Sequence, residues 1–225
     1  MEKKARIRNM GRRALTRDVA KGGAANFSGY FPSNKSDEPI PYEGLLERDF
    51  VALLEDDPAV SAYDALPPPL AWRDEIDAHV TAFNFQYWTR QGCTLVAVKY
   101  ARTVEKFDLE PLYGFARAYA LKDGYRGFEL WTEVEIRAMP RLANADMKNF
   151  QTAHEGDEPR FEAVRAALRA GGGRMSIGEL RDKSRLNADA YRAIIKLVAQ
   201  GKCVAEDPEQ LLDDRAILRQ GSNAP

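Results

Sequence analysis

The chain has 225 residues, of which 44% are hydrophobic and 30% are charged, and its net charge is −1. Such a composition is typical of a soluble globular protein of one or two domains, each able to bury a core. No apolar run reaches the length of a membrane span, and the basic N-terminus lacks the apolar region of a secretory signal, so we expect a cytoplasmic protein. Two cysteines and two histidines, all far apart in the sequence, argue against a disulfide framework and a His/Cys metal site.

The first 35 residues are strongly basic, with nine Lys or Arg against two acids. Few apolar residues interrupt these charges, which predicts a flexible basic arm over residues 1–25 without a core of its own. A basic arm favours a polyanion, and nucleic acid is the commonest one. The candidate DNA contacts in this arm are Arg12, Arg13, Arg17 and Lys21. The alternative is a solubilising tail.

The stretch "PYEGLLERDFVALLEDDPAV" predicts a helix. Apolar residues from Leu45 to Leu54 recur at helical spacing, and Asp57-Pro58 ends the pattern. Glu47 lies among these apolar positions in the first turn. There it is either an acid favoured by the helix dipole or a functional carboxylate.

The stretch that follows predicts strands. We expect a short strand near Val60, an extended edge at residues 67–69, and strands near 79–88 and 94–100 that turn at residues 90–92. A helix ending at Gly124 and a further strand complete an α/β core with a crossover helix. Lys99 closes a strand in this core, and an ammonium group there is costly to desolvate unless it has a partner or a task.

The last third predicts a separate domain over residues 158–225. After a linker-like break at 155–159, three helical segments follow, with caps at Ser176 and Asn187 and a terminator at Gly201. Two strand-like segments come next, so the order is that of a winged-helix domain. Its third helix would present Arg192 and Lys196 to DNA. A winged helix used for protein contact and a plain three-helix unit are the alternatives.

Several of these segments together carry a family resemblance. The stretch "FSGYFPSNKSDEPIPYEGLLERDFVALLEDDPAVSAYDALP" and the later "EIRAMPRLANADMKNF" resemble TnsA, the endonuclease subunit of heteromeric TnsA/TnsB transposases. The resemblance covers nearly all of the chain after about residue 20 and is most specific in "LLERDFVALLEDDP". It implies a restriction-endonuclease-like fold over residues 26–153, followed by the winged helix, and cleavage of DNA at transposon 5′ ends.

A nuclease of this kind uses carboxylates to hold Mg²⁺ and a lysine beside the scissile phosphate. The resemblance places the family's helix glutamate on Glu47 and its lysine on Lys99. It places the family's two other ligands on Asn84 and Ala97, and Leu66 replaces a glutamine. Because Asn brings no charge and Ala no ligand, we expect a degenerate site that needs no cofactor.

The resemblance therefore implies a DNA-binding assembly subunit, a pseudo-nuclease in DNA recombination. Its partners would be the DNA of transposon ends, a TnsB-like transposase and a TnsC-like ATPase. Two alternatives stay open. One is an active Mg²⁺-dependent endonuclease, in which Glu75 or Asp77 replaces a lost ligand, and the other is a winged-helix DNA-binding regulator.

Overall fold

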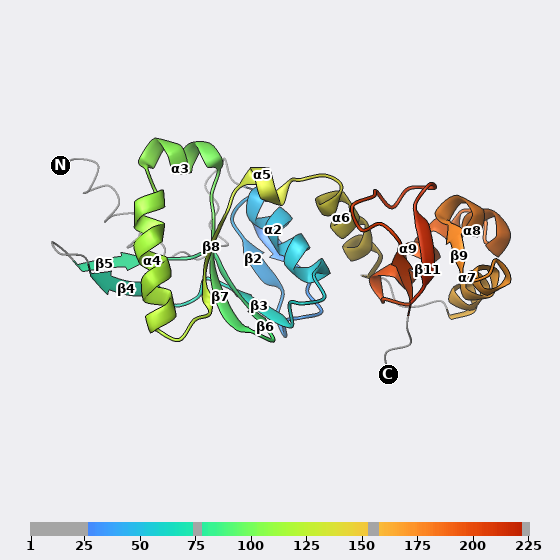
Figure 1. Ribbon diagram of the computed structural model, residues 1–225, viewed down its shortest axis with the longest axis horizontal. Coiled ribbons are helices and arrows are strands. Elements are labelled where there is room, and N and C mark those ends of the chain that lie inside the picture. The colour runs from blue at the N-terminus through green and yellow to red at the C-terminus, as the bar shows by residue number, and fades with distance from the viewer. Residues whose placement is uncertain (1–26, 74–77, 153–157, 222–225) are drawn as a thin grey trace. The chain divides into compact units, whose positions relative to one another are not determined.

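The computed structural model describes residues 27–73, 78–152 and 158–221, and they form a mixed α/β protein (Figure 1). The predicted basic arm, with Arg12, Arg13, Arg17 and Lys21, lies outside the described residues. The described residues form two compact units, one ending at Ala138 and one beginning at Met139. Within them, no helix has the length and apolar character needed to cross a membrane.

The first unit is built on a four-stranded sheet in the order β3-β6-β7-β8. The bounds of its strands are β3 Ala62–Ala65, β6 Phe85–Thr89, β7 Gly92–Val98 and β8 Gly127–Trp131. β6 and β7 form the predicted antiparallel hairpin, and Gly92 at its turn has a φ of 118°, which is why glycine suits this position. β8 runs parallel to β7 after the crossover helices α3 (Ala101–Phe107) and α4 (Glu110–Lys122).

Helices cover the two faces of this sheet. The predicted helix is α2 (Leu45–Asp56), and its Phe50 packs on Phe85 of β6 at 5.6 Å between ring centroids. α4 packs on the other face, where Leu95 of β7 shares an apolar cluster with Tyr113. Figure 1 shows α2 and α4 on opposite sides of the strands. The sheet is thus buried on both faces, as the apolar run in β7 requires.

Shorter elements complete the first unit. They are the antiparallel pairs β1 (Gly29–Phe31) with β2 (Ile40–Tyr42) and β4 (Leu70–Arg73) with β5 (Ala78–Thr81), and the short helix α5 (Glu133–Ile136). The sequence predicted one strand over 79–88, but the chain breaks it into β5 and β6. The break leaves Asn84 outside both strands, directly before β6.

The second unit contains the three predicted helices and a small sheet of order β10-β11-β9. The bounds are α7 Glu158–Ala170, β9 Arg174–Ser176, α8 Ile177–Ser184, α9 Asp189–Ala199, β10 Cys203–Ala205 and β11 Ile217–Gln220. Ser176 caps α8, as predicted, and forms the reciprocal hydrogen bonds of a capping box with Glu179. The prediction for Asn187 was wrong, because Ala188 occupies the cap of α9 and Asn187 itself has a φ of 50°.

Helix α6 (Arg141–Thr152) belongs to the second unit, so the division lies earlier than the predicted boundary between 153 and 158. Its buried Asn144 donates to the carbonyl of Gln210 at 2.9 Å and accepts from the amide of Leu212 at 3.0 Å. The hydroxyl oxygen of Tyr191 on α9 lies 3.3 Å from the sulfur of Met147. Buried hydrogen bonds such as those of the Asn144 side chain are costly to remove, so α6 is part of this unit's core.

We therefore expect a fragment of residues 139–225 to be more stable than one of residues 158–225 by about 2–4 kcal/mol, because the shorter one leaves the Gln210 and Leu212 main-chain groups unpaired. Urea unfolding of both fragments measures this difference. In the longer fragment Asn144→Ala should cost about 1–3 kcal/mol. Equal stability of the two fragments would contradict the assignment of α6.

Candidate nuclease-like site

Three of the predicted site residues meet at one end of the sheet of the first unit. Asn84 Nδ2 donates to Glu47 Oε1 at 2.6 Å, and Asn84 Oδ1 accepts from Lys99 Nζ at 3.1 Å. Glu47 comes from the first turn of α2, Asn84 from the residue before β6, and Lys99 from the residue after β7. Glu47 and Lys99, which lie 37 and 15 positions from Asn84 in the sequence, are thus linked through its side-chain amide by hydrogen bonds.

The main chain fixes Asn84 in this place. Its amide donates to the Val96 carbonyl at 2.9 Å, and its carbonyl accepts from Leu66 at 2.9 Å. Its side-chain Oδ1 also accepts from the amide of Val98 at 2.9 Å. Leu66 has a φ of 53°, an uncommon conformation for a branched residue, and such positions tend to gather near functional sites. The orientation of the Asn84 amide follows from these donors, because only its oxygen can face Val98 and Lys99.

Burial shifts the pKa of both charged residues of this cluster, Glu47 and Lys99. It raises the pKa of Glu47 above the usual value, while the backbone amide of Glu43, which donates to Glu47 Oε2 at 2.7 Å, and the charge of Lys99 oppose that shift. Burial also lowers the pKa of Lys99, against the attraction of Glu47 and Glu43. Each charge therefore makes the other less costly to bury.

Ala97, the fourth predicted position, does not join this group. Its side chain is fully buried in the apolar cluster that includes Leu95 and Tyr113. A methyl group in that environment offers no ligand to a metal and no proton donor to a substrate. The two acids proposed as replacements, Glu75 and Asp77, lie outside the described residues.

The described residues fit a Mg²⁺ ion poorly. Both oxygens of Glu47 already accept hydrogen bonds, and the oxygen of Asn84 already accepts two. Mg²⁺ prefers carboxylate oxygens and water in octahedral geometry, and the described residues hold no group of three His, Cys, Asp or Glu that could bind a metal. Glu43 is a further carboxylate whose charge acts on the site: it contributes to the raised pKa of Glu47 and opposes the lowered pKa of Lys99. Sequence reasoning missed it, because it precedes the helix.

A second buried carboxylate, Asp49, was also missed. It is 4% exposed and accepts from Arg137 Nε at 2.8 Å and from Arg48 Nε at 2.9 Å. The ion pair joins α2 to the end of α5, and it explains why both "ERDF" and "EIR" carry an arginine. The signal in the sequence was an acid at an apolar position of the helical pattern, which in a core requires a paired cation.

Exposed groups next to the site could contact a phosphate backbone. Tyr100 and Arg102 are exposed directly after Lys99, and the Arg102 guanidinium lies 5.5 Å from the centre of the Tyr100 ring. Lys106 is exposed one turn further along α3. These side chains lie on the surface, whereas Lys99 is mostly buried.

The third helix of the second unit, α9, differs from the prediction for DNA contact. Arg192 is exposed as expected, but Lys196 is 7% exposed and its ammonium group lies over the ring of Phe161 at 5.5 Å. Lys196 is therefore buried instead of projecting from the helix, and its ammonium group is stabilised by the face of the Phe161 ring. α9 also packs against α6, which covers part of its surface.

Many exposed arginines of the second unit pair with acids. The pairs are Arg160 with Asp189, Arg165 with Glu158 and Glu162, Arg169 with Glu162, Arg174 and Arg219 with Glu206, Arg181 with Asp214, and Arg215 with Asp213. Paired side chains attract phosphate less than unpaired ones. The second unit thus lacks an obvious basic stripe over the residues that the structure describes.

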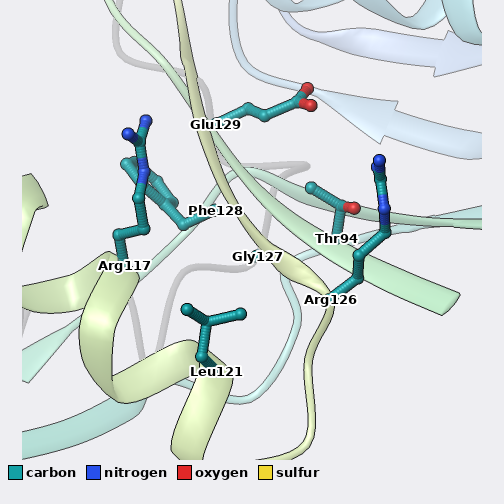
Figure 2. A pocket seen from close by; sticks show the side chains of 7 residues that line it. All are labelled: Thr94, Arg117, Leu121, Arg126, Gly127, Phe128 and Glu129. Carbon is teal, nitrogen blue, oxygen red and sulfur yellow. The ribbon is translucent and has the colours of Figure 1, made fainter. Parts of the chain in front are cut away.

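A small hollow of 210 Å³ lies elsewhere on the first unit, at the start of β8 (Figure 2). Figure 2 shows Arg117 of α4 on one side of this strand and Arg126 on the other, with Glu129 on the strand itself. None of the predicted site residues lines it. The hollow is therefore not part of the Glu47–Asn84–Lys99 cluster.

Comparison with known proteins adds no family to this description. None of the family models matches the chain, and no curated protein is significantly similar to it in sequence.

Proposed function

We propose that the chain is a TnsA-like subunit of a heteromeric transposase that binds DNA and takes part in assembly without cutting it. The observation that carries the proposal is the position of Asn84 between Glu47 and Lys99. A nuclease of the restriction-endonuclease-like class needs a helix acid, a strand acid and a lysine at one place. This chain brings the three positions together but with a neutral amide in the middle.

The amide changes what the cluster can do. An aspartate at residue 84 would face the Glu47 carboxylate at hydrogen-bond distance, and a divalent cation would relieve that repulsion. The asparagine relieves it with its own Nδ2 hydrogen. Glu47 and Asn84 are the residues that would hold a metal here, but their oxygens already accept hydrogen bonds from the protein, so they would supply little metal-activated water.

The fold supports the same proposal. A mixed sheet with α2 and α4 on its two faces and the site at the end of two adjacent strands is the arrangement expected of a restriction-endonuclease-like core. Three helices and a three-stranded sheet are the arrangement expected of a winged helix. With Lys196 buried in α9, we propose that this second unit serves chiefly for contact with a partner protein, a TnsB-like transposase or a TnsC-like ATPase.

In this proposal, DNA contacts come from the arm and from the exposed groups near Lys99. The protein is expected to bind duplex DNA with strong salt dependence. Removing residues 1–21, which hold eight Lys or Arg, should weaken binding and flatten the plot of log affinity against log salt. Each lost phosphate contact removes about one unit of slope.

The measurement is a salt titration of duplex binding by fluorescence anisotropy, with the full chain beside the shortened one. As a control, Arg192→Glu tests the second unit and should leave the slope unchanged. An unchanged slope after removal of the arm would count against the arm as a DNA contact. Absence of any duplex binding by the full chain would overturn the proposed function.

A further inference from the structure

Three aromatic rings are stacked beside α4 in the first unit. Trp72 of β4 lies 4.2 Å from His79 of β5 with an interplanar angle of 18°, and 5.3 Å from Phe115 of α4 with an angle of 8°. Trp72 is 5% exposed and donates from Nε1 to the hydroxyl of Thr81 at 2.8 Å, so its ring is fixed in place. The stack is therefore a rigid column of nearly parallel rings.

Phe115 ends this column at the surface. Its side chain is 48% exposed, although one side contacts Trp72. Two nearby residues on α4, Gly114 and Ala118, are small and exposed, and a methyl group added at Gly114 would meet no atom within 4 Å. Part of the Phe115 ring is thus open to solvent.

A lysine and an arginine lie near the column. Tyr119 contacts Trp72 at 6.3 Å between ring centroids, and the Lys122 ammonium lies 4.8 Å from the Tyr119 ring centre. The Tyr119 hydroxyl donates to the carbonyl of Arg73, whose side chain is exposed. A flat aromatic surface beside positive charge is the combination that binds single-stranded nucleic acid, because bases stack on the ring and the cations attract phosphate.

The column and the Glu47–Asn84–Lys99 cluster belong to the same compact unit. β5 leads into Asn84 within three residues, and Leu70 of β4 and Tyr113 of α4 share the apolar cluster of Ala97.

We propose that Phe115 is a stacking platform for an unpaired base of a DNA strand. This inference rests on the proposed function, since it names one contact that a DNA-binding subunit would make. It is independent of cleavage, because stacking needs neither a metal nor an acid.

The test measures binding of the full chain to a single-stranded thymidine oligonucleotide and to a duplex of equal length, by fluorescence anisotropy. Phe115→Ala is expected to weaken single-strand binding about 5- to 150-fold, the effect of losing one base–aromatic stack, and to change duplex binding less than twofold. Phe115→Tyr should keep the affinity, and Phe115→Leu should lose it, because leucine keeps apolar area without a flat ring. Leu121→Ala is the matched control, since Leu121 is 56% exposed on the same helix outside the column.

Three results would overturn the inference. They are unchanged single-strand affinity in Phe115→Ala, full affinity in Phe115→Leu, and an equal loss of duplex affinity. Failure of the full chain to bind either DNA would instead remove the proposed function itself. In the first of these three cases, loss of capture by a purified TnsB-like transposase in Phe115→Ala would identify the column as a protein contact instead.

Discussion

Replacing Asn84 with Asp is expected to destabilise the first unit by about 2–4 kcal/mol at neutral pH without divalent metal. The substitution keeps the shape of the side chain and the acceptor for Val98 and Lys99. It removes the Nδ2 hydrogen that bonds Glu47 Oε1 at 2.6 Å and brings two buried carboxylates together. Lys99 alone cannot compensate two negative charges, so the two carboxylates then share one proton.

The loss of stability caused by Asn84→Asp should be larger at neutral pH than at acidic pH. Repulsion raises the shared carboxyl pKa above its unfolded value of about 4. A raised carboxyl pKa contributes stability that is fully present below the unfolded pKa and is lost as the pH rises through the folded pKa. The stability gap between Asn84→Asp and the natural chain should therefore narrow as the pH falls from neutral towards 4, and urea unfolding at several pH values measures it.

Metal and a second substitution provide the controls. Millimolar Mg²⁺ should stabilise Asn84→Asp but not the natural chain, because only the variant offers two facing carboxylates. Adding Glu47→Gln to Asn84→Asp should recover much of the stability and remove the metal effect, since the glutamine amide can donate to the new carboxylate. If Asn84→Asp were as stable as the natural chain at every pH, the amide bridge would have no energetic role.

The sequence allowed the elements around the site to be predicted, because their signals are local. The apolar spacing of α2, the turn at Gly92 and the position of Lys99 at the end of β7 all depend on neighbouring residues. The resemblance added Asn84 as the partner of Glu47, and the structure brings the two side chains together. A long-range contact of this kind was accessible only through the family pattern.

Other features depend on contacts between distant residues and were not predicted. Lys196 fits the helical pattern of an exposed cation, but its ammonium group lies over the ring of Phe161. The sequence predicted that the segment of helix α6 belongs to the first domain, whereas Asn144 on this helix accepts a hydrogen bond from the amide of Leu212 in the second unit. The hairpin of β4 and β5 directly follows a proline-rich segment, and its aromatic contact with Phe115 depends on the crossover helix α4 packing beside it.

The central claim is that the site holds its three positions together without cleaving DNA. The direct test is incubation of the purified full chain with DNA carrying transposon ends, in Mg²⁺ and in Mn²⁺, alone and with the TnsB-like transposase that we propose as its partner. We expect binding but no nicking above the level of Glu47→Ala and Lys99→Ala variants, because Asn84 and Ala97 supply no anionic ligand. Metal-dependent nicking that disappears in those two variants would contradict the account, and its further loss in Glu43→Gln would identify Glu43 as the replacement ligand.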